Sequence, residues 1–235
     1  MLYHGTSSKN LFSILNNGIS PRNENSSTWE DYKSRKDCVY LTTAYALYFA
    51  INACKNGEKA VIIEIDESLL DKENMYPDED FISQILQQQE KDLPLNLIHQ
   101  YVLNNIDKYK NLWKDSLNGL GNCAYKGIIP IECINRICVI DLNNIHKYWL
   151  MYNDPSISIL NYKFVGKFKY QNMIKWLFGD IKEYLEFGNI EKQEKLMLFE
   201  TKHLEMCTHR EGIKIVNIKE GKENSSIQEL LKQNI

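Results

Sequence analysis

The sequence predicts a mixed α+β fold, and three features of its 235 residues support that prediction. Short runs rich in β-branched and aromatic residues predict strands. Longer apolar segments with helical spacing lie between them and predict helices. Apolar residues make up 43% and charged residues 25% of the chain, which is typical of a globular protein and excludes a disordered chain, a collagen or a coiled coil.

The first two expected elements are a strand and a helix. Residues 2–6 (LYHGT) are an apolar run that ends in Gly and Thr, so we expect a strand that enters a tight turn. Residues 7–21 follow with their apolar positions on one helical face. Ser7 or Ser8 is expected to cap the start of this helix, and Gly18 its end.

A polar loop, two strands and a helix are expected next. Residues 20–37 are polar and aperiodic, and loops of this length are often functional. Residues 38–42 (CVYLT) predict a strand, and residues 43–57 predict an apolar helix that ends at Asn-Gly. Residues 60–66 (AVIIEID) predict a buried strand.

The following segment is expected to be mainly helical. Residues 71–120 are rich in Gln, Lys, Leu and Asn, and Pro77 and Pro94 are expected to break the helices. Two more strands are expected at residues 123–129 and 134–141.

The character of the sequence changes near residue 145. Aromatic helical segments with Lys and Glu follow, together with one late strand at residues 212–218. We therefore expect two domains, which comprise residues 1–145 and a mostly helical extension at residues 146–235.

The first motif with chemical content is His4-Gly5-Thr6, at the end of the first expected strand. A histidine ring here would lie beside a glycine backbone, which a flat ligand can approach closely. The alternative is a histidine that only caps a turn.

The second motif is VYLTTAYALYFA, at residues 39–50. Tyr40 faces opposite to its neighbours on the strand, and Tyr45 and Tyr48 follow on the helix. Aromatic rings at such a junction can stack on a planar ligand. Ordinary core packing explains the same pattern, and we prefer that interpretation for Tyr45.

The order of these motifs resembles the ADP-ribosyltransferase superfamily. The shared order is HGT, a helix ending in Gly-Ile, a polar loop, VYLT and an Ala-rich helix. The chain is similar to the branch with a His–Tyr–Glu signature, which includes poly-ADP-ribose polymerases, diphtheria-type toxins and DarT-like DNA-modifying toxins. The resemblance covers residues 2–66 and, more weakly, 112–141. It implies a split β-sandwich in residues 1–145 and NAD-dependent transfer of ADP-ribose.

By position, the resemblance implies an NAD site. His4 matches the histidine that hydrogen-bonds a ribose hydroxyl, and Gly5 matches the glycine whose backbone pairs with the nicotinamide carboxamide. Tyr40 matches the signature tyrosine, and both His4 and Tyr40 are assigned to catalysis as well as to NAD binding. The remaining residues assigned to NAD binding are Thr6, Thr42 and Tyr48.

The third signature position does not hold a carboxylate. In DarT-like sequences a glutamate begins a strand ahead of a segment resembling IPxExI, and the corresponding count in NCAYKGIIPIECI gives Asn122. The polymerase pattern gives a position nearer Tyr125. Some mono-ADP-ribosylating relatives also lack this glutamate. Asn122 can orient a hydroxyl but carries no charge, so Glu132 is the alternative catalytic carboxylate, unless it is a surface residue at a helix start.

Three charged stretches have two interpretations each. Residues 64–68 (EIDES) and 76–80 (YPDED) hold clustered carboxylates, which suit metal binding or acid–base chemistry. Carboxylates at a helix start are also favoured by the helix dipole, and for residues 78–80 we prefer that interpretation. Residues 161–176 interleave lysines with aromatic residues, as in a platform for single-stranded nucleic acid or an amphipathic packing face.

The expected function is mono-transfer of ADP-ribose from NAD to a nucleic-acid or protein acceptor, by an intracellular toxin or a phage-defence factor with an antidote protein as partner. The alternatives are a catalytically silent NAD- or nucleotide-binding module and an RNA 2′-phosphotransferase-like enzyme, for which the arginines are too few. The net charge of −3 argues against strong non-specific polyanion binding.

The expected compartment is the cytoplasm. No apolar run is long enough to span a membrane and no signal peptide is seen, so we expect no membrane partner. The six cysteines show no metal-ligand spacing and are interpreted as reduced, mostly buried thiols, and no metal is expected.

Overall fold

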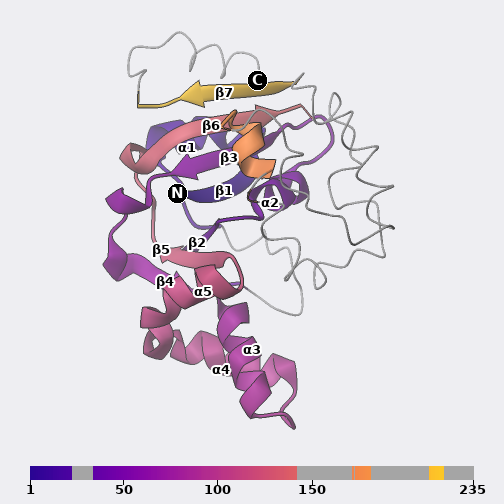
Figure 1. The fold of residues 1–235 in the computed structure, drawn as a ribbon, viewed down its shortest axis with the longest axis vertical. Coiled ribbons are helices and arrows are strands. Elements are labelled where there is room, and N and C mark those ends of the chain that lie inside the picture. Colours follow the sequence, from indigo (N-terminus) through magenta and orange to yellow (C-terminus); the bar gives the residue numbers. More distant parts are fainter. Residues whose placement is uncertain (23–33, 142–170, 172, 181–211, 220–235) are drawn as a thin grey trace. The chain divides into compact units, whose positions relative to one another are not determined.

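The fold consists of two units in the computed structural model, which describes residues 1–22, 34–141, 171, 173–180 and 212–219. The first unit comprises Met1–Leu2, Phe12–Thr43 and Ile65–Ile134, and the second comprises Tyr3–Leu11, Ala44–Glu64 and the described residues from Asn135 onwards. Each unit contains both strands and helices, which confirms the predicted mixed α+β class (Figure 1).

The first unit combines three strands with a group of helices. The strands follow the order β4–β5–β2 and both pairings are antiparallel. Tyr40 lies opposite Ala124 and Thr42 opposite Asn122. The elements of this unit are α1 (Leu11–Asn17), β2 (Cys38–Thr42), β4 (Met75–Pro77), α3 (Glu79–Gln89), α4 (Leu95–Asn105), α5 (Trp113–Gly119) and β5 (Asn122–Lys126).

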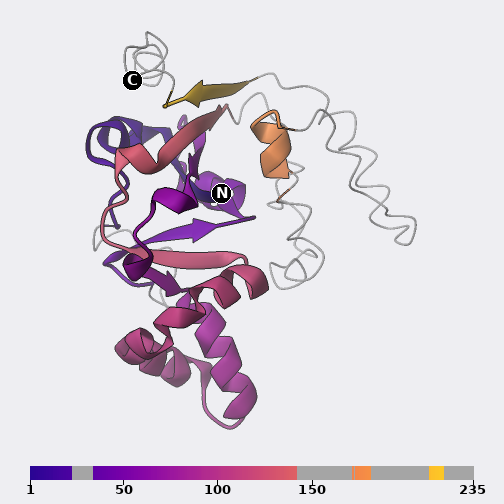
Figure 2. The same cartoon turned by 60° about the vertical axis from the view of Figure 1, so that its left-hand side comes forward.

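Helices α3 and α4 begin at the prolines that the sequence marks. Pro77 ends β4, and Asp78 caps α3 by accepting a hydrogen bond from the backbone N–H of Asp80 at 2.9 Å. Pro94 directly precedes α4. The two helices lie side by side (Figures 1 and 2) and bury apolar side chains, among them Ile82 and Val102, in one cluster.

Strand β4 is not predicted from the sequence. Its three residues are too few to show an alternating pattern, and it forms by pairing with β5. Strand β5 ends at Lys126 rather than at residue 129, because the backbone turns at Gly127, whose φ is +90°. The other predicted strand of this unit, at residues 38–42, is confirmed as β2.

The second unit has the strand order β1–β3–β6–β7, and β6 and β7 are antiparallel. The late strand predicted at residues 212–218 is confirmed as β7. Its pairing with β6 joins residues on either side of position 145. Residues 142–170 lie outside the described residues, so the two-domain division stays a prediction. The elements are β1 (Leu2–Ser7), α2 (Ala46–Ala53), β3 (Ala60–Ile65), β6 (Ile134–Ile140), β7 (Ile213–Asn217) and the helical residues 173–177.

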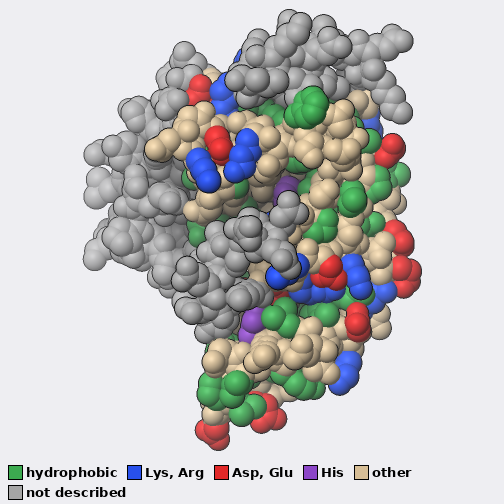
Figure 3. Space-filling model, turned by 180° about the vertical axis from the view of Figure 1, so that it is seen from behind, with side chains coloured by type: hydrophobic (Ala, Val, Ile, Leu, Met, Phe, Trp, Pro, Cys, Tyr) green, Lys and Arg blue, Asp and Glu red, His purple; other side chains and the backbone are tan. Residues whose placement is uncertain are grey.

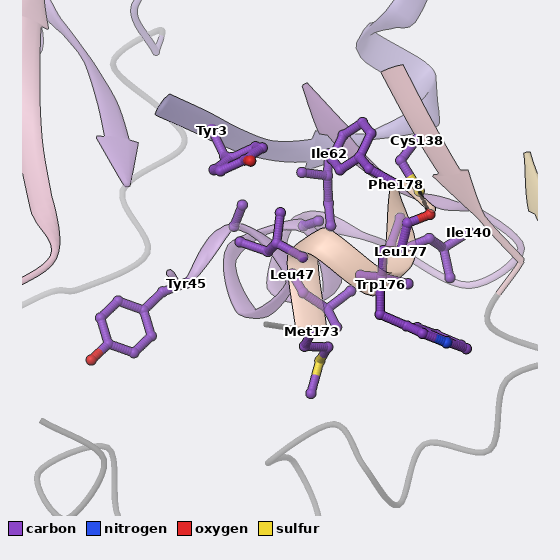
Figure 4. Packing of buried hydrophobic residues seen from close by; sticks show 14 of the residues in the cluster. Tyr3, Tyr45, Leu47, Ile62, Cys138, Ile140, Met173, Trp176, Leu177 and Phe178 are labelled. Carbon is purple, nitrogen blue, oxygen red and sulfur yellow. Dashed lines mark hydrogen bonds between the residues drawn. The ribbon is translucent and has the colours of Figure 1, made fainter. Parts of the chain in front are cut away.

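The core of the second unit lies between its strands, α2 and residues 173–178 (Figure 4). Ile62 and Cys138 from the strands pack with Leu47 from α2, and the Cys138 thiol donates to the Leu177 carbonyl at 3.8 Å. Tyr45 is 9% exposed in this core, as the sequence predicts. The C-terminal end of the basic and aromatic stretch 161–176 also packs here, while residues 161–170 and 172 lie outside the described residues.

Candidate active site

Tyr40 is the central residue of the candidate site in the first unit. Because side chains alternate along strands, it shares one face of the three strands with Thr42 and with the paired residues Asn122 and Ala124. Ala124 and Tyr40 belong to the apolar cluster that α3 and α4 complete. The phenol therefore points to the side of the strands that these helices cover.

The Tyr40 hydroxyl connects two parts of the first unit. It donates a hydrogen bond to the Glu79 carboxylate and accepts one from the backbone N–H of Arg35 at 2.8 Å. Burial, followed by the charges of Glu79 and Asp78, raises the pKa of Tyr40 well above its ordinary value. The phenol therefore keeps its proton and acts as a neutral donor to Glu79.

Glu79 is a functional candidate that sequence reasoning assigns to helix capping. Asp78 is the actual cap, whereas the Glu79 residue is only 2% exposed at the first position of α3. Burial raises the pKa of its carboxyl, although the hydrogen bond from Tyr40 opposes that shift. Its Oε2 atom is buried with no hydrogen-bond partner, which is costly for a carboxylate unless a ligand or proton uses it.

The start of β5 lies next to the start of α3, and Ser116 connects them. The fully buried Ser116 Oγ accepts from the backbone N–H of Asp78 at 3.0 Å and donates to the Asn122 carbonyl at 2.8 Å. The side-chain Oδ1 of Asn122 is buried without a partner. The structure thus places two unpaired acceptors, on Glu79 and Asn122, at two element starts that one hydroxyl holds together.

Thr42 and Glu132, the other predicted residues of the first unit, have structural positions. The Thr42 hydroxyl donates to the Gly121 carbonyl at 2.8 Å and so fixes the end of β2 to the turn before β5. Glu132 is exposed in the first turn of a 3₁₀ helix, Ile131–Cys133. Their roles in catalysis and NAD binding stay predictions.

Arg35 lies above the same group of strands. Its guanidinium stacks over the Tyr76 ring at 4.5 Å from the centroid and binds Asp37 through Nε at 3.2 Å and Nη2 at 2.9 Å. Its Nη1 atom is buried without a hydrogen-bond partner. Arg35 is a second residue of this site that the sequence does not mark, because its stacking depends on the unpredicted strand β4.

The second unit holds the HGT motif on β1. Gly5 packs directly against α2, where an added Cβ would lie 2.0 Å from the Ala46 carbonyl oxygen and 2.6 Å from the Ala50 nitrogen. The close approach of strand and helix is therefore one reason for a glycine here. By alternation, His4, which is half-buried, and Thr6 lie on the opposite face of β1.

The predicted NAD-binding residues of the second unit do not all share one side of β1. Tyr48 lies on α2, about 180° around the helix from Ala46 and Ala50, so it is turned away from Gly5. Helix α2 itself covers the face of β1 opposite to His4. The Thr6 hydroxyl accepts a hydrogen bond from the Asn10 side chain at 2.9 Å. His4 and Tyr48 thus lie on opposite sides of the strand.

The described cysteines are free thiols, as the sequence predicts, and four of the five are buried. Burial raises the pKa of Cys38 and Cys123 above the ordinary value, so neither is an activated nucleophile. Within residues 1–22, 34–141 and the shorter described segments, no cluster of His, Cys, Asp and Glu is arranged to hold a metal ion. No helix in the described part of the chain is long and apolar enough to cross a membrane.

On the face shown in Figure 3, acidic and basic side chains lie next to one another in several places. Comparisons of the chain with protein-family models, with curated proteins and with solved structures found no match.

Proposed function

We propose that the chain is an NAD-dependent ADP-ribosyltransferase that attaches a single ADP-ribose to a nucleic-acid or protein acceptor inside the cell. The proposal includes the split β-sandwich that the motif order implies, and the role of a toxin or defence factor. One contact in the structure supports the proposal in addition to the motif order. The buried Glu79 carboxylate accepts a hydrogen bond from Tyr40, the residue at the signature tyrosine position.

Glu79 supplies what the third signature position lacks. Cleavage of the bond between nicotinamide and ribose develops positive charge on the ribose, and a fixed carboxylate stabilises such charge. Asn122 cannot do this, but Glu79 lies at the neighbouring element start and is fixed by the neutral Tyr40 hydroxyl. Its unpaired Oε2 is available to accept a proton or a hydrogen bond from the attacking group.

The buried and unpaired atoms support a polar ligand at this site. Glu79 Oε2 and Asn122 Oδ1 are acceptors, and a ribose or an acceptor nucleophile offers the hydroxyl or N–H donors that would satisfy them. A structural carboxylate in a closed core would normally have both oxygens bonded. The unpaired Oε2 atom therefore supports a role for Glu79 in ligand binding or catalysis in addition to its place at the helix start.

The test is turnover of labelled NAD by matched variants of helix α3. Glu79→Gln removes the charge but keeps the shape, and Glu90→Gln makes the same change at the exposed end of the helix. We expect Glu79→Gln to lower turnover about 10²–10³-fold with little change in NAD affinity, since loss of one charge-stabilising group costs about this much. Digestion of the labelled products with nuclease or with protease identifies the acceptor class. Full turnover by a folded Glu79→Gln protein would refute the catalytic role of Glu79, and a wild type that consumes no NAD would refute the transferase.

A silent NAD- or nucleotide-binding module is the second candidate, and the neutral Asn122 favours it. In that case the wild type binds NAD without consuming it in any lysate, and neither Glu79→Gln nor Glu132→Gln changes the bound amount. Measurable hydrolysis or transfer by the wild type would exclude this candidate.

A further inference from the structure

A buried histidine on helix α4 contacts helix α3, which carries Glu79. The His99 residue is 5% exposed, and its Nδ1 atom lies 3.4 Å from Ser83 Oγ on α3. The Ser83 hydroxyl donates to the backbone carbonyl of Glu79 at 2.8 Å. A continuous set of contacts therefore runs from α4 through Ser83 to the residue that begins α3.

The position of His99 suits an apolar residue better than a polar one. Its neighbours in the helix, Ile98 and Val102, are buried in the apolar cluster between α3 and α4. A leucine would pack there without the cost of removing a polar ring from water. What the histidine adds is a hydrogen-bonding nitrogen toward Ser83. The Asp80 carboxylate lies 3.8 Å from the same Nδ1 atom.

We propose that His99 is a positioning residue for Glu79. His99 holds Ser83, and with it the first turn of α3, so that the Glu79 carboxylate stays directed at Tyr40. The inference rests on the proposed function for its link to catalysis. The contacts themselves, from α4 to Ser83 and from Ser83 to Glu79, are independent of that function.

The electrostatic surroundings assign His99 a second effect on the same carboxylate. The charge of Asp80 raises the pKa of Glu79, whereas His99 lowers it. Tyr40 and Cys38 on β2 and the capping Asp78 are the other titratable groups beside Glu79.

The kinetic test compares His99→Leu, Ser83→Ala and their combination. We expect kcat to fall about tenfold to a hundredfold with KM unchanged, because a small displacement of a catalytic group costs this much. The double variant should be no worse than His99→Leu. His99→Asn keeps a polar atom near the place of Nδ1 and should recover most of kcat. Gln100→Leu, on the exposed side of α4, is the matched control. An equal loss in the Asn and Leu variants would overturn the proposal.

A second measurement does not depend on turnover. The free energy of unfolding is measured for wild type, Glu79→Gln, His99→Leu and the double variant, with His99→Asn in place of Leu if the latter does not fold. We expect the two effects to be non-additive, since both residues belong to one contact network. Additive effects would overturn the positioning role whatever the activity. Non-additive effects in a chain that turns over no NAD would instead remove the proposed function and leave the positioning of the carboxylate in place.

Discussion

The contact between Gly5 and α2 predicts that Gly5→Ala destabilises the fold whether or not a ligand is bound. The added Cβ would lie 2.0 Å from the Ala46 carbonyl oxygen, whereas real Cβ contacts are at least about 3.0 Å. Both sides of the contact are backbone, so β1 or α2 must move by about 1 Å. Forced overpacking of this kind costs about 3 kcal/mol, which lowers Tm by about 6–12 °C in a chain of this length.

The assay is thermal unfolding followed by circular dichroism, with Gly57→Ala as the control. Gly57 has φ of +83° and no atom within 4 Å of an added Cβ, so alanine there meets only backbone strain of about 1 kcal/mol. Gly5→Ala must therefore be clearly the less stable variant. If it is as stable as wild type, or more stable than Gly57→Ala, the packing argument is refuted. Loss of NAD binding in a Gly5 variant would by itself say nothing about the ligand, so His4→Ala is the better test of the motif.

Two further predictions concern buried carboxylates. Arg136→Met should destabilise the second unit by about 3–5 kcal/mol in urea unfolding. The variant leaves the Glu64 carboxylate, which is only 3% exposed, without the guanidinium that binds it. Lys175→Met, on the exposed side of residues 173–177, is the control and should cost far less. Burial raises the pKa of Glu79 above the 4.5 that is ordinary for glutamate, so the folded chain holds a proton that the unfolded chain releases, and ionisation opposes folding as the pH rises. Glu79→Gln should therefore gain stability relative to wild type as the pH rises above 4.5 in urea titrations, and a relative loss would contradict the assigned direction.

Short-range patterns account for most of the predicted elements. The apolar runs of β1, β2, β3 and β6 and the proline positions at α3 and α4 are visible in the sequence, because each depends on neighbours a few residues apart. Strand β4 depends on pairing with β5, so its three residues carry no signal of their own. The late strand β7 is predicted as an element, but its place beside β6 is not.

The sequence likewise identifies some residues of the candidate site and not others. Tyr40 and Asn122 are identified by motif order, and the β2–β5 register does bring them to one face. In the sequence Glu79 is only one of three consecutive acidic residues. Its role differs from that of the capping Asp78 because Glu79 is buried and accepts a hydrogen bond from the Tyr40 hydroxyl. The ligand role of Gly5 stays a prediction from the motif, and the contact of Gly5 with the α2 backbone is visible only in the structure.

The sequence by itself determined the mixed α+β class, the positions of most strands and helices and the free state of the described thiols, because composition and local periodicity decide them. Tertiary structure decided which carboxylate meets Tyr40, why Gly5 has no side chain, and which histidine supports α3. These features join residues that are 39, 41 and 16 positions apart in the chain. Contacts at such separations arise from strand pairing and helix packing, which no local pattern encodes.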